Sequence, residues 1–239
     1  MGTRGDEIEP DDRVHVRRLD AVDTLRWSRG VLADSLELVG LAFAVGLLSV
    51  VALVGVSPTA TPPTEPPRID GWVWPVYLVF FVGIALVWGA VYATADAAVE
   101  ERDPSLADRL RHAVTRLPAL FATGVLTWVV SALGFILFVL PGVYLFHRLV
   151  LAYPACVIDG TGPVGSLRAG WRASKGNAAT VFGVSVGYFG LAVGSNVAAS
   201  ALGQYTVLGR LVSAGLTAGV LPLFGLAFGH LYLERSRNW

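Results

Sequence analysis

The chain has 239 residues, of which 54% are hydrophobic and 15% are charged, and its 18 basic and 18 acidic residues give zero net charge. Soluble domains carry about 25% charged residues, so this composition excludes a soluble globular enzyme, a disordered tail protein and a coiled coil. It indicates a polytopic, all-α membrane protein without a nucleic-acid partner. Cys156 is the only cysteine, which excludes an intrachain disulfide and a cysteine-based metal cluster.

Five segments are long and apolar enough to be membrane spans. Residues 1–37 precede them and lack the basic start and apolar core of a secretory signal, so the first span is expected to act as its own insertion signal. A helix needs about 20 apolar residues to cross a bilayer. The segments that meet this requirement are residues 38–56, 72–95, 118–140, 177–202 and 207–233.

A sixth segment, residues 142–158, is short for a span and contains His147 and Arg148. It could cross the membrane, re-enter it or lie in the interface. Cytoplasmic loops collect Lys and Arg, so the basic residues help to decide. They concentrate in four segments: residues 1–30, 96–117, 159–176 and 235–239. If the sixth segment crosses, all four segments fall on one side of the membrane. If it does not, the last two lie opposite the N-terminus.

We therefore predict a six-helix transmembrane bundle over residues 31–234 in the cell membrane. The N-terminal segment, residues 1–30, and the tail, residues 235–239, are both expected in the cytoplasm. The remaining connections, residues 57–71 and 203–206, are poor in basic residues, as expected for the outer side.

Three basic, amphipathic stretches precede the outward-going spans: residues 20–30, 105–117 and 166–176. Such helices lie in the headgroup layer with their cations toward anionic lipid, so membrane lipids are expected partners. The pattern indicates three units, each an interfacial helix followed by a helical hairpin. The alternative is that cytoplasmic loops before spans are simply basic.

Arg148 is the most informative residue, because a guanidinium inside a span costs roughly 3 kcal/mol on insertion scales and usually faces a partner or a cavity. Asn196 is the nearest polar residue in depth on this topology. One interpretation of Arg148 is a binding site for an anionic headgroup or substrate. The other is a structural arginine that snorkels to the interface or caps helix ends.

Four carboxylates lie at the inner ends of the spans: Asp34, Glu37, Asp96 and Asp159. We expect them to meet arginines of the same layer, namely Arg26, Arg29, Arg102 or Arg168. A proton or cation relay would need acidic residues nearer the middle of the membrane.

Glycines recur in pairs four residues apart in the last two spans: Gly183, Gly187, Gly190, Gly194, Gly215, Gly219, Gly225 and Gly229. Small residues at this spacing let helices approach closely, so we expect these two helices to form the tightest pair. Residues 183–187 also fit the motif G-x-S-x-G. Together with His230, this motif suggests a second interpretation, an intramembrane hydrolase that uses Ser185 as nucleophile. That motif needs a strand–turn–helix setting, so packing is the favoured interpretation.

No Walker loop, zinc-protease motif or dinucleotide fingerprint occurs in the sequence. The four histidines are too dispersed to argue for a metal site. We therefore expect no cofactor and no metal.

Residues 134–176 carry a recognisable pattern of a Pro-Gly pair, an aromatic residue, an arginine, a proline, an acidic turn and a tryptophan-containing amphipathic helix ending in glycine. Its positions include Pro141, Gly142, Arg148, Pro154, Trp171 and Gly176. The pattern resembles the membrane-domain family found beside glycerophosphodiester phosphodiesterases and in stand-alone bacterial and archaeal membrane proteins. The resemblance implies a six-helix bundle with interfacial helices. It implies no reaction, because the phosphodiesterase chemistry belongs to a separate soluble domain.

The sequence thus favours a non-enzymatic accessory, scaffold or lipid-interacting membrane protein, with a protein partner or a second copy of the chain as further candidates. The alternative is a small transporter or permease-like component that uses Arg148 to bind an anionic substrate. An intramembrane hydrolase is the third interpretation.

Overall fold

The computed structural model describes residues 16–57, 68–175, 177–203 and 206–238, so Gly176 of the sequence pattern lies outside the described residues. Within these ranges the chain is almost entirely helical. The helices are α1 (Ala21–Asp34), α2 (Leu36–Leu53), α3 (Val73–Val99), α4 (Leu106–Leu137), α5 (Val139–Leu149), α6 (Ala152–Ile158), α7 (Pro163–Ala173), α8 (Ala178–Ala201) and α9 (Val207–Arg237). Strands β1 (Val56–Ser57) and β2 (Arg68–Ile69) form a short antiparallel pair.

Six helical segments are long and apolar enough to cross a membrane, which confirms the predicted fold class. They are α2, α3, α4, the segment Val139–Ile158 that comprises α5 and α6, α8 and α9. The uncertain sixth segment thus has the required length, although Val150 and Leu151 interrupt it between α5 and α6. The side chains of Asp20, Ser105 and Thr206 cap the first turns of α1, α4 and α9 by accepting backbone N–H bonds.

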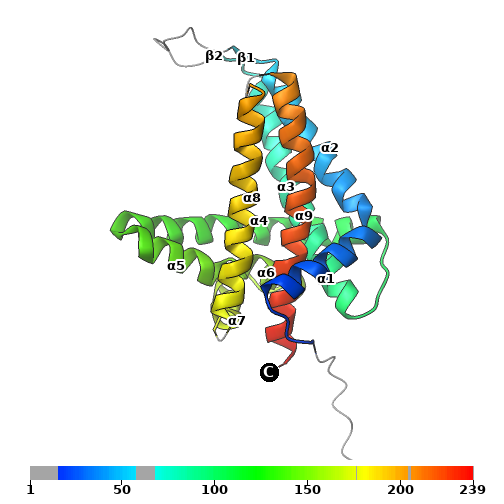
Figure 1. Ribbon diagram of the computed structural model, residues 1–239, viewed down its shortest axis with the longest axis vertical. Coiled ribbons are helices and arrows are strands. Elements are labelled where there is room, and N and C mark those ends of the chain that lie inside the picture. The colour runs from blue at the N-terminus through cyan, green and yellow to red at the C-terminus, as the bar shows by residue number, and fades with distance from the viewer. Residues whose placement is uncertain (1–15, 58–67, 176, 204–205, 239) are drawn as a thin grey trace, which may run out of the picture.

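Helix α9 lies at the centre of the bundle. It packs against α2, α3 and α8, and the four helices run along the long axis of the molecule in Figure 1. One apolar cluster joins α9 to α6 and α8 around Phe224 and Phe228. A second cluster joins α9 to α2 and α3 around Leu221 and Leu226. By contrast, α4 and α5 form a hairpin that runs across these four helices and projects to one side (Figure 1).

Two of the three predicted interfacial stretches form separate helices, α1 and α7. The third stretch, residues 105–117, is helical but not a separate helix, because it continues without a break into α4, with Pro118 inside the helix. Proline removes one backbone hydrogen bond, but the residues before it are held by packing. The Ala113 methyl fits against Gly89 of α3, where a Cβ would lie 2.6 Å from it. This packing keeps the two parts of α4 in one helix.

The glycines of the last two spans pack differently from the prediction. Gly225 and Gly229 of α9 face α3, where added Cβ atoms would lie 2.6 Å from Val91 Cγ1 and from Ala95 Cβ. The other six are less tightly packed. Among the described atoms, Gly187 faces Phe224, Gly183 faces Ala21, Gly215 meets Phe43 at 4.0 Å, and Gly190, Gly194 and Gly219 have no neighbour within 4 Å of an added Cβ. Four-residue spacing identifies a small-residue face, but it does not identify the helix that covers it.

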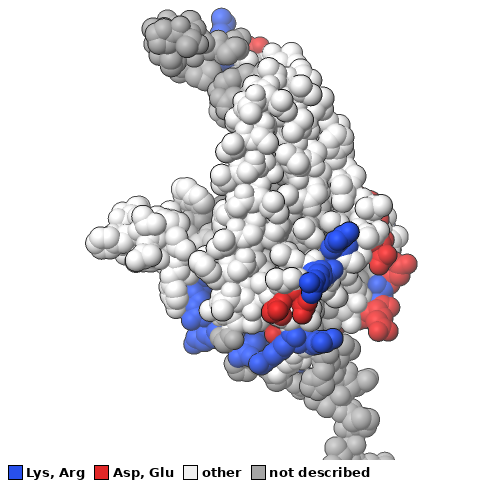
Figure 2. All heavy atoms as spheres, in the orientation of Figure 1, with Lys and Arg blue, Asp and Glu red and all other residues white. Residues whose placement is uncertain are grey.

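Most of the charged side chains visible in Figure 2 gather at one end of the bundle, below the projecting hairpin. Both ends of the described chain meet there. The Val16 N–H donates to Asn238 Oδ1 at 3.1 Å, and Asn238 Nδ2 donates to the Val16 carbonyl at 2.7 Å. Nearby, the buried Glu234 carboxylate accepts hydrogen bonds from Leu19 N and Asn177 Nδ2. We call this region the charged end.

Candidate functional site

Arg148 lies beside two aromatic rings where α5 meets α7. Its Nε donates to Tyr144 Oη at 3.1 Å, and its guanidinium carbon is 5.3 Å from the Tyr144 ring centroid and 5.2 Å from that of Trp171. Its Nη1 donates to Ser174 Oγ at 3.3 Å, and Ser174 Oγ lies within reach of the Arg148 carbonyl at the same distance. We call these four residues the Arg148 cluster. They tie α5 to α7 through both hydrogen bonds and cation–π contacts.

Helical spacing and a tight turn assemble the Arg148 cluster. Tyr144 and Arg148 are four residues apart on α5, so they share a face of that helix. The chain then reverses after α6 at Gly160, whose φ of +64° suits glycine, and α7 returns beneath α5. Gly170 allows this return, because a Cβ there would collide with the backbone of α6, lying 2.8 Å from Ala152 Cα.

The structure separates the two residues that the sequence placed at a common site. Asn196 is exposed on α8 and donates to the Ala192 carbonyl of its own helix at 2.8 Å. The described contacts of Arg148 are those of the Arg148 cluster and do not include Asn196. Because neighbours already engage the Arg148 guanidinium, the geometry favours its structural interpretation.

The remaining motif residues support the hairpin and the turn around this cluster. Pro141 and Gly142 lie in the first turn of α5, where Gly142 packs against the Phe135 ring of α4. Pro154 is buried in α6. The motif residues within the described chain therefore shape one connected region, α4 to α7.

An open groove lies beside the Arg148 cluster on α7. It has a volume of about 560 Å³ and a mainly apolar lining. The residues that line it are Leu149, Leu167, Arg168, Trp171 and Arg172. Arg168 and Arg172 are exposed and four residues apart, so both cations edge an apolar surface on the same face of α7.

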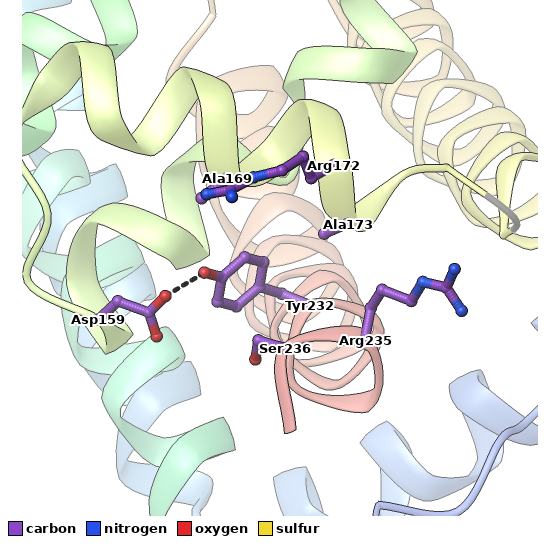
Figure 3. A pocket seen from close by; sticks show the side chains of 7 residues that line it. All are labelled: Asp159, Ala169, Arg172, Ala173, Tyr232, Arg235 and Ser236. Carbon is purple, nitrogen blue, oxygen red and sulfur yellow. Dashed lines mark hydrogen bonds between the residues drawn. The ribbon is translucent and has the colours of Figure 1, made fainter. Parts of the chain in front are cut away.

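A second, smaller pocket of about 300 Å³ lies between α7 and α9. Tyr232 Oη donates to the Asp159 carboxylate inside it, and Figure 3 shows the Arg172 side chain lying along α7 on the other side of the ring. Arg172 thus borders both the groove and the pocket. No sequence pattern predicts the Asp159–Tyr232 pair, because the two residues are 73 positions apart along the chain.

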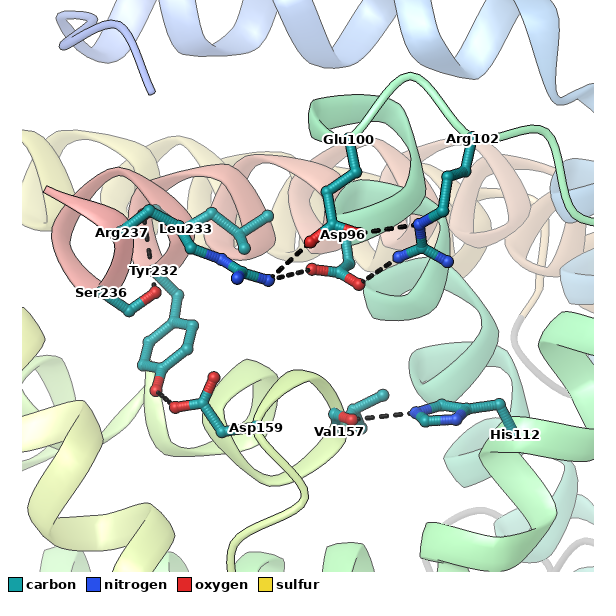
Figure 4. A network of polar contacts seen from close by, with 10 residues as sticks. All are labelled: Asp96, Glu100, Arg102, His112, Val157, Asp159, Tyr232, Leu233, Ser236 and Arg237. Atoms are coloured by element: carbon teal, nitrogen blue, oxygen red, sulfur yellow. Dashed lines mark hydrogen bonds and ion pairs between the residues drawn. The ribbon is translucent and has the colours of Figure 1, made fainter. Parts of the chain in front are cut away.

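Ion pairs link the end of α9 to the end of α3 and to the residues that follow it (Figure 4). The four side chains are Asp96, Glu100, Arg102 and Arg237. Arg237 Nη2 lies 3.2 Å from Asp96 Oδ1 and 2.8 Å from Glu100 Oε1. Arg102 binds the same two carboxylates from the opposite side, at 2.7 Å each. The alternation of opposite charges makes this network a structural clamp at the charged end.

Ser185 and His230 do not form a nucleophile–base pair among the described residues. The G-x-S-x-G segment lies inside α8, and Ser185 Oγ is buried without a hydrogen-bond partner in the described structure. The His230 ring packs instead against Trp27 of α1, with centroids 4.4 Å apart. Within the described ranges, no three His, Cys, Asp or Glu side chains come together as a metal site requires.

Replacing Arg148 tests its structural role. We expect Arg148→Ala to lower the free energy of unfolding by about 2 kcal/mol, because it removes two cation–π contacts and a hydrogen-bonded link to α7. Arg148→Lys should recover only part of this loss, since an ammonium cannot reproduce the planar guanidinium. The free energy of unfolding is measured by SDS titration in mixed micelles. Unchanged stability together with altered uptake of an anionic solute would contradict the structural role and favour transport.

No protein-family model, curated protein or solved structure matches the chain. The family resemblance in residues 134–176 therefore stays a prediction.

Proposed function

We propose that this integral membrane protein is a non-enzymatic, lipid-interacting bundle that binds anionic lipid at the groove of α7. The observation that carries the proposal is the pairing of two exposed guanidinium groups, Arg168 and Arg172, with an open apolar groove. A phospholipid has the matching chemistry, because its phosphate can accept hydrogen bonds from arginine while its acyl chain covers apolar surface.

The surroundings of the groove support this assignment. Trp171 borders it, and tryptophan is favoured at the level of lipid headgroups. The Arg148 cluster fixes α7 against α5 and so holds the groove in a defined shape. Helix α1 is a second amphipathic helix at the charged end, and basic residues also lie on the α3–α4 connection and at the end of α9.

The charge distribution also supports an orientation. Since cytoplasmic segments collect Lys and Arg, we place the charged end, with both termini, on the cytoplasmic side of the cell membrane. The groove of α7 would then face the inner leaflet, whose anionic lipids attract basic helices.

Lipid retention in native mass spectrometry tests the site. We expect the purified protein to retain phosphatidylglycerol in preference to phosphatidylcholine. The double variant Arg168→Ala/Arg172→Ala should weaken phosphatidylglycerol binding about 30-fold, because each basic residue near an anionic surface contributes about 1 kcal/mol.

The matched control is Arg26→Ala/Arg111→Ala. This variant removes the same charge from two exposed arginines that pair with aspartates three residues away, at 2.9 Å and 3.3 Å. It should retain most of the preference for phosphatidylglycerol. Equal losses in the two variants would show nonspecific attraction and would overturn a site on α7.

A further inference from the structure

The turn between α4 and α5 consists entirely of apolar residues. Residues 132–143 contain no polar side chain. The large side chains at the tip are strongly exposed, reaching 79% for Ile136 and 81% for Leu140. The connections at the end of the bundle opposite the charged end differ, because one carries Arg68 and Asp70 and the other, residues 203–206, reads Gly-Gln-Tyr-Thr. A turn exposed to water on that side would be expected to resemble them.

The single residue of this turn has both of its backbone groups hydrogen-bonded. Phe138 is the only residue between the two helices. Its N–H donates to the Gly134 carbonyl at 3.0 Å, and its carbonyl accepts from Gly142 N at 3.2 Å. The two glycines permit this close reversal, since a Cβ at Gly134 would lie 2.8 Å from Gly142 Cα. These two bonds pair the N–H and the carbonyl of Phe138, as hydrocarbon surroundings require of a backbone group.

The base of the hairpin is fixed at the charged end. His112 Nε2 lies 2.9 Å from the Val157 carbonyl, and Arg116 Nη1 donates to the Gly160 carbonyl at 3.2 Å. These contacts hold the start of α4 beside the end of α6. From this base the hairpin runs crosswise to α8 and α9 in Figure 1 and projects to one side, and in Figure 2 its uncharged projection lies immediately above the charged side chains.

We propose that α4 and α5 form a re-entrant hairpin, which enters and leaves the bilayer on the charged side and ends among the acyl chains of that leaflet. Length and composition allow both segments to cross. The direction of the hairpin and its apolar tip, however, favour contact of the tip with acyl chains rather than with water. The basic-residue bias is the same for both arrangements, because residues 96–117 and 159–176 stay on one side whether the hairpin crosses twice or not at all. This inference does not depend on lipid binding at α7.

Cysteine accessibility tests the position of the tip. The background variant is Cys156→Ser, which removes the lone buried cysteine. Phe138→Cys then reports on the tip, Thr206→Cys on the opposite end of the bundle and Arg111→Cys on the charged end. Each is treated with a membrane-impermeant maleimide in vesicles of both orientations. We expect Thr206→Cys and Arg111→Cys to react from opposite sides, and Phe138→Cys to react from neither side until detergent is added.

Reaction of Phe138→Cys from the side that labels Thr206→Cys would show a hairpin that crosses and would overturn the proposal. Reaction from the Arg111→Cys side would place the tip at the surface and would also overturn it. A second measurement separates lipid contact from burial in protein: a bimane attached at position 138 in detergent is reconstituted into vesicles. Quenching by lipids brominated on their acyl chains is expected, and a loss of that quenching would contradict the proposal.

Discussion

Gly170→Ala is expected to lower the free energy of unfolding by about 3 kcal/mol, at the upper end of the cost of overpacking a tight site. The added Cβ would meet the backbone at the start of α6, including Leu151 C at 2.8 Å. Backbone cannot rotate away as a side chain can, so α7 must shift as a whole. Such a shift would also separate Trp171 from Arg148.

The matched control for this substitution is Gly190→Ala on α8. No described atom lies within 4 Å of a Cβ at Gly190, so this variant should keep the stability of the parent protein or exceed it slightly. Both variants are compared by SDS titration in mixed micelles. Equal stabilities for Gly170→Ala and Gly190→Ala would contradict the close approach of α7 to α6.

Arg109→Ala is expected to cost about 2–3 kcal/mol of unfolding free energy, somewhat less than the loss of a fully buried pair. The Arg109 side chain is only 7% exposed and binds Glu37 Oε1 at 2.8 Å, whereas Glu37 itself is 38% exposed and is partly screened by solvent. Arg109 Nε also donates to the Pro104 carbonyl at 3.0 Å. The substitution therefore removes a link between α2 and α4.

A double-mutant cycle isolates this pair. Combining Arg109→Ala with Glu37→Ala should show a coupling energy of about 1–2 kcal/mol. The control is Arg111→Ala, two residues further along α4 on its exposed face. It should change the free energy of unfolding by about 0.5 kcal/mol or less. A coupling energy near zero would mean that Arg109 acts through packing alone.

Hydropathy sufficed to predict five of the six membrane-length helices, because the cost of placing polar groups in hydrocarbon is a property of each segment by itself. The sixth was predicted from the distribution of basic residues. Hydropathy could not predict the direction of α4 and α5. That direction depends on contacts such as His112 with the Val157 carbonyl, which join segments on either side of the hairpin. Likewise, the pattern marked Arg148 and Trp171, but their contact depends on how α6 reverses the chain.

The carboxylates show the same limit at the level of single pairs. Asp96 pairs with Arg102, as predicted. Glu37 pairs with Arg109 rather than with an arginine of α1, and Asp159 binds Tyr232. Depth along a span predicts that these groups share a layer, whereas the choice of partner within the layer depends on which helices are neighbours.

The meeting of α1 with α9 has a consequence for biosynthesis. Val16 and Asn238 are 222 positions apart. At about 5–20 residues per second, a ribosome therefore needs roughly 10–45 s after Val16 to synthesise the end of α9. Until then, the Trp27 ring of α1 lacks His230 of α9, against which it packs in the finished protein. Helix α1 is therefore made long before the helix on which it docks, and a nascent chain arrested before α9 would leave α1 without this partner.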